Sequence, residues 1–283
     1  MRKILFSLFV LSQIVSCSLF DSAAPEPAFL IVDEVSIQTT NSQGAPTHNI
    51  RDVWVYADGQ LLGTFEIPAM IPVIPNGSTT EFQIFPGIRN NGEISRSFIY
   101  RFMDIKIFTE ELQPGETINK SFTFEYNDNV KFDFVEGFES NHIFTFDMDG
   151  NEETFIKTTG SVKKSGERSG LIEISPEYPE LGAATIINFD GANNAGSDSY
   201  LELDYYNEEP LLVGVIYIED NIEYTQPIIV LNTTTDWNKI YIDYTNFLAS
   251  PAITNYRIFF SAVNNSLDGS KKIYIDNVKF LHL

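Results

Sequence analysis

Cysteine is almost absent from this sequence, since Cys17 is the only one among 283 residues. A single cysteine excludes an internal disulfide, so we expect packing alone to stabilise the fold. Histidine is nearly as rare, and His48, His142 and His282 form no spaced group of zinc ligands and no nucleophile, base and orienter set. No phosphate-binding glycine loop is present. These absences argue against an enzyme and against a disulfide-stabilised scaffold.

Basic residues are also scarce. The chain has 18 Lys and Arg against 39 Asp and Glu, which gives a net charge of −21. Nucleic acid and anionic lipid surfaces would repel such a protein, so we expect no nucleic-acid partner. The charge is sufficiently explained by solubility at a crowded surface and identifies no ligand.

No apolar run is long enough to cross a bilayer, which takes about 20 residues. The longest, residues 4–15, follows Arg2 and Lys3 and ends at the small Ser16 before Cys17. This pattern is typical of a signal peptide, and we predict cleavage after residue 16. Loss of Arg2 and Lys3 with that peptide takes the net charge from −21 to −23.

Residues 14–17, Ile-Val-Ser-Cys, resemble the lipobox of bacterial lipoproteins. The resemblance implies a diacylglyceryl group on the Cys17 sulfur and an acyl group on its amine, and two acyl chains hold a protein firmly to a membrane. Ser18 follows instead of Asp, which in related lipoproteins argues against retention at an inner membrane. We therefore expect a lipid-anchored protein of the outer membrane, on the cell surface, with residues 17–28 as its tether.

Helical periodicity is missing beyond the tether. The apolar runs are short, rich in Ile, Val, Phe and Tyr, and bounded by Asn, Asp, Gly or Pro, which predicts an all-β protein. In a first domain, residues 29–131, Asp58-Gly59 between two apolar runs predicts a tight hairpin. With the further strands we expect there, this domain reads as a small β-sandwich. The expected strands are residues 53–56, 61–65, 71–74, 80–85, 98–108 and 116–124.

A second domain, residues 132–283, has candidate strands at the spacing of a jelly roll. In residues 200–206, Leu201, Leu203 and Tyr205 alternate with polar and aromatic residues, as expected for a sheet with one buried and one solvated face. The expected strands are residues 184–189, 200–206, 211–217, 228–231, 237–244, 256–263 and 273–281.

Both domains resemble known modules. Residues 54–88 are similar to the immunoglobulin-like or transthyretin-like modules of outer-surface lipoproteins of Bacteroidota-type bacteria, and this resemblance implies no active site. Residues 137–139, 164–170 and 273–278 resemble the jelly roll of carbohydrate-binding modules, which has a galactose-binding-like fold. A weaker match at residues 235–240 makes Trp237 a packing residue at a strand entry.

The second resemblance also implies a structural calcium. The matching positions are Glu139, the carbonyls near Lys164 and Glu167, and Asp276, and calcium takes six to eight such oxygens. The alternative is that Glu139 and Asp276 are solvated edge residues. Residues 147–151 begin like an EF-hand loop but lack its later glutamate, so we expect a polar turn there.

Sugar binding needs aromatic rings that stack on a pyranose and polar groups that bond its hydroxyls. We expect such a surface on the solvated faces of the second domain, although cross-strand pairing explains the same residue types. The candidate ligand-binding residues are Tyr200, Glu202, Asp204, Tyr206, Tyr241 and Arg257.

The sequence therefore predicts a non-catalytic, lipid-anchored protein of the cell envelope that binds a glycan through its second domain. One alternative is a structural or assembly subunit of an envelope complex, in which the same faces bind a protein. A weaker alternative is a glycoside hydrolase, because Asp and Glu are plentiful and only their separation in space decides their role.

Overall fold

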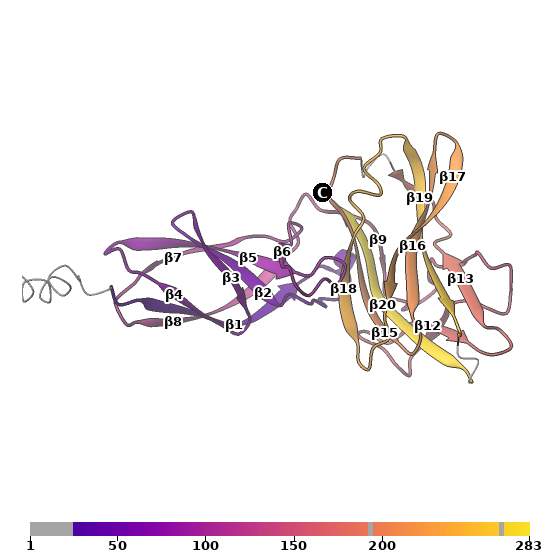
Figure 1. Ribbon diagram of the computed structural model, residues 1–283, viewed down its shortest axis with the longest axis horizontal. Helices are drawn as coiled ribbons and strands as arrows, with labels where there is room; N and C mark the ends of the chain where they lie inside the picture. Colours follow the sequence, from indigo (N-terminus) through magenta and orange to yellow (C-terminus); the bar gives the residue numbers. More distant parts are fainter. Residues whose placement is uncertain (1–24, 192–194, 266–268) are drawn as a thin grey trace, which may run out of the picture.

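The computed structural model describes residues 25–191, 195–265 and 269–283, which form two β-sandwich domains joined end to end (Figure 1). No α-helix occurs in these ranges, and none of their helical turns could span a membrane. Cys17, the signal peptide and most of the expected tether lie outside the described residues.

The N-terminal domain packs two sheets face to face. One has the order β4-β1-β8, with β1 and β8 parallel, and the other has the order β3-β2-β5, with β6 and β7 also paired to β5. The strands are β1 (Ala28–Gln38), β2 (Asp52–Ala57), β3 (Gln60–Glu66), β4 (Ala69–Val73), β5 (Thr79–Ile88), β6 (Phe98–Ile99), β7 (Lys106–Glu111) and β8 (Thr117–Glu125).

The predicted hairpin is confirmed, because Asp58 and Gly59 join β2 to β3 with φ of 48° and 75°. Two positive φ values are what a two-residue hairpin loop requires. The prediction of one strand over residues 98–108 is wrong. The chain leaves the sheet after Ile99 and turns, with Met103 N donating to Tyr100 O, so that Tyr100 and Phe102 are buried at the domain junction.

The C-terminal domain is a jelly roll. Its sheets have the orders β11-β12-β20-β15-β18, with β9 on β20, and β10-β13-β19-β16-β17, with β14 on β19. The fold class predicted from sequence, two all-β domains of sandwich and jelly-roll type, is confirmed. The strands are β9 (Lys131–Glu136), β10 (Phe146–Asp147), β11 (Lys157–Thr159), β12 (Ser169–Ile174), β13 (Glu180–Ala184), β14 (Phe189–Asp190), β15 (Ser199–Asn207), β16 (Leu211–Glu219), β17 (Ile222–Leu231), β18 (Asn238–Asp243), β19 (Ile253–Val263) and β20 (Lys271–His282).

Two large apolar cores lie within the described residues, besides a small cluster of Ala184, Ile216 and Phe259. The jelly-roll core lies between its sheets and contains Phe138, Phe144 and Phe280, all fully buried. The second core belongs to the N-terminal sandwich, yet it includes Tyr241 from β18 and Leu281 from β20. The outer face of β15, β18 and β20 is thus covered by the N-terminal domain, and the two domains share apolar packing.

Candidate functional site

The junction between the domains buries a polar cluster centred on Glu202, which is 0% exposed. Its Oε1 accepts hydrogen bonds from the hydroxyls of Tyr100 at 2.6 Å and Tyr126 at 2.7 Å, both from the N-terminal domain. Its Oε2 lies 3.0 Å from Lys239 Nζ on the neighbouring strand β18. A buried carboxylate persists only when it is paired and hydrogen-bonded, so this residue needs both domains.

Asp204, two residues along β15, extends the cluster. Its Oδ2 accepts from Thr47 Oγ1 at 2.6 Å and from Asn277 Nδ2 at 3.0 Å. Lys279 on β20 donates from Nζ to the carbonyl of Ala45 at 3.0 Å. Burial lowers the pKa of Lys279 to about 8. Each of these contacts except that of Asn277 crosses the domain junction.

The charge state of Glu202 argues against catalysis. Burial alone would raise its pKa, but the ammonium groups of Lys239 and Lys279 and the two tyrosine hydroxyls outweigh burial and lower the pKa to about 2. A general acid for glycoside cleavage needs a raised pKa and contact with substrate. Glu202 has neither property, and Asp204 is completely buried like Glu202, so neither carboxylate can contact a substrate.

Four of the six predicted ligand-binding residues therefore lie in the junction, and the expectation that they face solvent is wrong. Glu202 and Asp204 belong to the polar cluster. Tyr241 is 1% exposed and its hydroxyl accepts from Asn49 N at 3.0 Å. The half-buried ring of Tyr200 packs edge-on against Phe102 with centroids 5.3 Å apart. Glu202 and Asp204, both 0% exposed, could meet a glycan only if the domains separated.

The other two residues lie on different sheets. Tyr206 on β15 stacks on Tyr274 of β20, its cross-strand neighbour, with centroids 5.6 Å and planes 14° apart. Trp237, with its centroid 6.3 Å from that of Tyr206, packs there as predicted for a strand entry. Arg257 on β19 instead covers the ring of Phe146 at 4.1 Å. The structure therefore does not bring all six predicted residues together into one site.

Glu139 and Asp276 both lie against the segment of residues 164–167, as predicted for a calcium site. However, their carboxylates face backbone N–H groups and not carbonyl oxygens. Glu139 accepts hydrogen bonds from the backbone N–H of Glu167 at 3.0 and 3.1 Å, and Asp276 Oδ2 accepts from the N–H of Lys164 at 3.0 Å and of Ser165 at 3.1 Å. Amide N–H groups cannot ligate a cation, so this arrangement does not fit calcium. No group of three or more His, Cys, Asp or Glu suited to a metal occurs among the described residues. Calcium remains a prediction that the hydrogen bonding does not favour.

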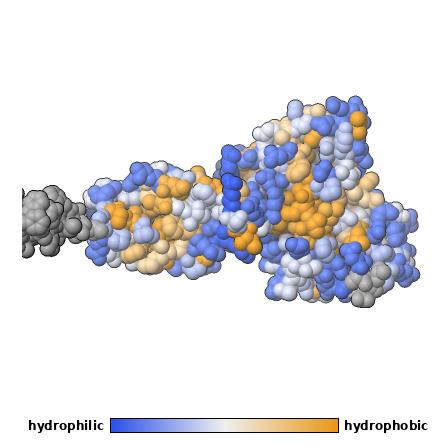
Figure 2. Space-filling view, viewed as in Figure 1, coloured by the Kyte–Doolittle hydropathy of each residue, from blue (hydrophilic) through white to orange (hydrophobic). Residues whose placement is uncertain are grey.

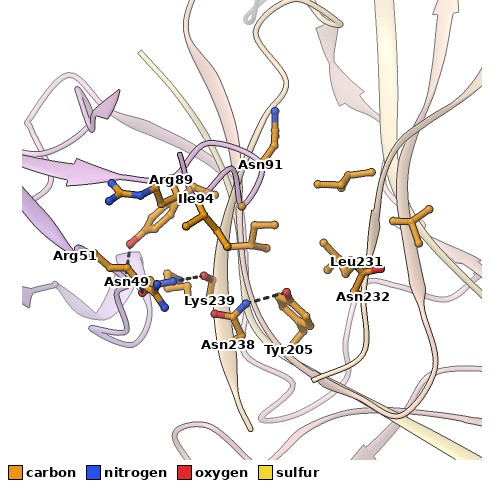
Figure 3. A pocket seen from close by; sticks show the side chains of 15 residues that line it. Asn49, Arg51, Arg89, Asn91, Ile94, Tyr205, Leu231, Asn232, Asn238 and Lys239 are labelled. Atoms are coloured by element: carbon orange, nitrogen blue, oxygen red, sulfur yellow. Dashed lines mark hydrogen bonds between the residues drawn. The ribbon is translucent and has the colours of Figure 1, made fainter. Parts of the chain in front are cut away.

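A pocket of about 250 Å³ opens beside the buried cluster, between the two domains (Figure 3). We call it the junction pocket. Strands β17 and β18, the edge strands of the two jelly-roll sheets, form one side, and residues from the N-terminal domain form the other. Its apolar lining residues are Ile94, Ile229, Val230, Leu231 and Ile240. Its polar side chains are those of Asn49, Arg51, Arg89, Asn91, Asn232, Asn238 and Lys239.

Hydrogen bonds to the edge of β18 fix the polar groups of the pocket. Asn49 Nδ2 donates to Lys239 O at 2.9 Å, and Asn91 N donates to Tyr241 O at 2.8 Å. Asn91 Oδ1 in turn accepts from the N–H of Asp243 at 2.9 Å. The N-terminal domain thus satisfies an exposed strand edge and orients its own amides at the same time.

Each of these amides keeps bonding capacity for a ligand. An Asn side chain has two N–H donors and an acceptor oxygen with two lone pairs. Asn238 donates one N–H to Tyr205 Oη at 2.9 Å, and the side-chain oxygen of Asn91 accepts one hydrogen bond from the N–H of Asp243. A ligand with several hydroxyls could therefore bond these groups while its carbon skeleton contacts the apolar wall.

Sequence reasoning missed this pocket. The Arg89-Asn90-Asn91-Gly92 turn is a visible loop signal, because Asn and Gly accept the positive φ that Asn91 and Gly92 adopt, 53° and 71°. Its partner strand lies some 150 residues further along the chain, and nothing in the local pattern connects the two.

No family model and no curated protein matches the chain. Solved structures are similar to parts of it. The CBM22-1–GH10 modules of xylanase 10B from Clostridium thermocellum, complexed with xylohexaose, are 15% identical with a TM-score of 0.41, covering 54% of this chain and 28% of that one. This chain thus spans less than a third of that structure.

Two further similar structures are matched over most of their own length. A xylan-binding domain from CBM 22 is 13% identical with a TM-score of 0.39, covering 54% of this chain and 96% of that one. The family 30 carbohydrate-binding module of a cellulosomal cellulase of Clostridium thermocellum is 12% identical with a TM-score of 0.39, covering 53% and 96%. Likeness at this level carries no argument about function.

Proposed function

We propose that this protein is a lipid-anchored protein of the outer cell surface that binds a glycan without cleaving it, and that the junction pocket holds one sugar residue of that glycan. The observation that carries the proposal is the convergence of side-chain amides from both domains on a pocket with an apolar wall. Sugar recognition requires this combination, since hydroxyls need paired donors and acceptors and the C–H face needs apolar contact.

The size of the pocket supports a partial ligand. A volume of about 250 Å³ lies below the range of pockets that enclose a drug-sized molecule, so a single ring or chain end is the suitable occupant. The rest of the glycan would lie along the surface. No Asp or Glu is among the described residues that line the pocket, which supports binding without hydrolysis.

A glycan array with the mature chain carrying Cys17→Ala tests the proposal. Ile94 is 82% exposed, so Ile94→Ala should fold normally and weaken binding by loss of apolar contact, while Asn238→Ala should weaken it about tenfold by loss of one hydrogen bond. Ile74→Ala, an exposed isoleucine outside the pocket, is the matched control. If no glycan on the array binds, or if only Tyr206→Ala abolishes binding, the proposal is contradicted.

A protein partner is the second candidate function, and β17 favours it. This edge strand exposes Ile222 and Val230, each 54% accessible, and Tyr224 at 41%. Figure 2 shows an apolar area near the middle of the visible face of the jelly roll. Unpaired strand edges accept an added strand from another chain. A silent glycan array together with a cross-linked envelope protein that Ile222→Lys abolishes would favour this function.

A further inference from the structure

One cation of the junction pocket is not neutralised within the protein. Arg51 Nε donates to Asn49 Oδ1 at 3.1 Å, which holds the guanidinium beside the pocket (Figure 3). Arg51 also borders a hollow that contains Glu34 and Glu66, yet no carboxylate of the described residues lies within ion-pair distance of it. Its terminal N–H groups are therefore available to a ligand.

The other cations of the pocket are already paired. Arg89 forms an ion pair with Asp52, and Lys239 lies 3.0 Å from Glu202 and 3.9 Å from Asp204. Among the described residues of the pocket, the guanidinium of Arg51 is therefore the one charged group without an ion-pair partner. The other groups that a ligand could contact there are amides and apolar side chains. An unpaired positive charge in a pocket of a protein with a net charge of −21 favours a ligand that carries a negative charge.

We propose that the junction pocket takes an acidic sugar, and that Arg51 binds its carboxylate; this inference rests on the proposed glycan-binding function. Guanidinium and carboxylate are both planar and form two parallel hydrogen bonds, a geometry that a hydroxyl cannot match. The amides of Asn91 and Asn238 then bond the ring hydroxyls, and Ile94 and Ile240 contact the C–H face.

Calorimetric titration with matched sugars tests the inference. Methyl glucuronoside and methyl galacturonoside are compared with the corresponding neutral methyl glycosides and with the uronoside methyl esters. At about 0.15 M salt the screening length is about 8 Å, so the remote negative charges of the protein oppose the anion only weakly. We expect a uronoside to bind at least tenfold more tightly than its neutral counterpart and its ester.

Variants locate the preference. Arg51→Gln should reduce the tenfold preference for the uronoside to parity, and Arg51→Lys should keep part of that preference. Arg168→Gln, an exposed arginine on the jelly roll outside the pocket, is the control and should change nothing. Equal affinity of acidic and neutral sugars for the unsubstituted protein would overturn this inference but leave the proposed function intact. Binding of neither class would overturn both.

Discussion

Glu202 is the residue on which the domain junction depends most. It carries a buried negative charge that two buried ammonium groups and two tyrosines from the other domain compensate. Glu202→Gln removes the negative charge that compensates the buried ammonium groups of Lys239 and Lys279. We therefore expect the free energy of unfolding to fall by about 3–5 kcal/mol. Urea unfolding measures the loss, and the exposed Glu223→Gln on β17 serves as the control. A loss below about 1 kcal/mol would contradict the compensating role.

The same residue predicts a dependence on pH. The pKa of Glu202 falls from an ordinary 4.5 to about 2 on folding, so its contribution is complete above pH 4.5 and is lost as pH falls from 4.5 toward 2. The shift corresponds to about 3 kcal/mol. The free energy of unfolding of the unsubstituted protein should therefore decline more steeply over this interval than that of Glu202→Gln. Parallel curves would show that Glu202 is not the group responsible.

Glu139 makes a separate prediction about calcium. The carboxylate of Glu139 accepts a hydrogen bond from the backbone N–H of Glu167. We therefore expect Glu139→Gln to lower the free energy of unfolding by about 1–2 kcal/mol. For the same reason, the melting temperature of the whole protein should be equal in millimolar calcium and in chelator. A calcium-dependent rise that Glu139→Gln abolishes would restore the cation site implied by the sequence resemblance.

At the scale of elements, the loop of residues 89–94 acts as a cap on β18. Asn91 both donates to and accepts from that strand, and its φ of 53° disfavours a side chain that cannot bond locally. Asn91→Ala should therefore speed hydrogen exchange at the amide of Asp243 and weaken ligand binding in the junction pocket. Asn246→Ala, an exposed asparagine just beyond β18, is the matched control. Unchanged exchange at Asp243 would mean that the loop does not protect the edge.

The positions of several strands, such as β15, were predictable, but the environment of their faces was not. Alternation over residues 200–206 correctly separates Leu201 and Leu203 from Glu202 and Asp204, because a strand reverses its side chains at each residue. Because Glu202 and Asp204 are charged, the sequence alone predicts that their face of the sheet is exposed to solvent. The N-terminal domain buries that set instead, with partners such as Thr47 that lie 157 residues away along the chain. Such pairing depends on tertiary structure, and no local pattern encodes it.

For the whole molecule, the shared core predicts that the domains unfold together. Tyr241 and Leu281 of the jelly roll are buried in the core of the N-terminal domain, so separating the domains exposes apolar surface on both. Calorimetry should give one transition, with equal calorimetric and van't Hoff enthalpies. A chain that begins at residue 131 should melt lower and bind a hydrophobic dye. Two resolved transitions, or a fragment as stable as the whole protein, would mean that the domains only touch and that the junction pocket lacks a fixed shape.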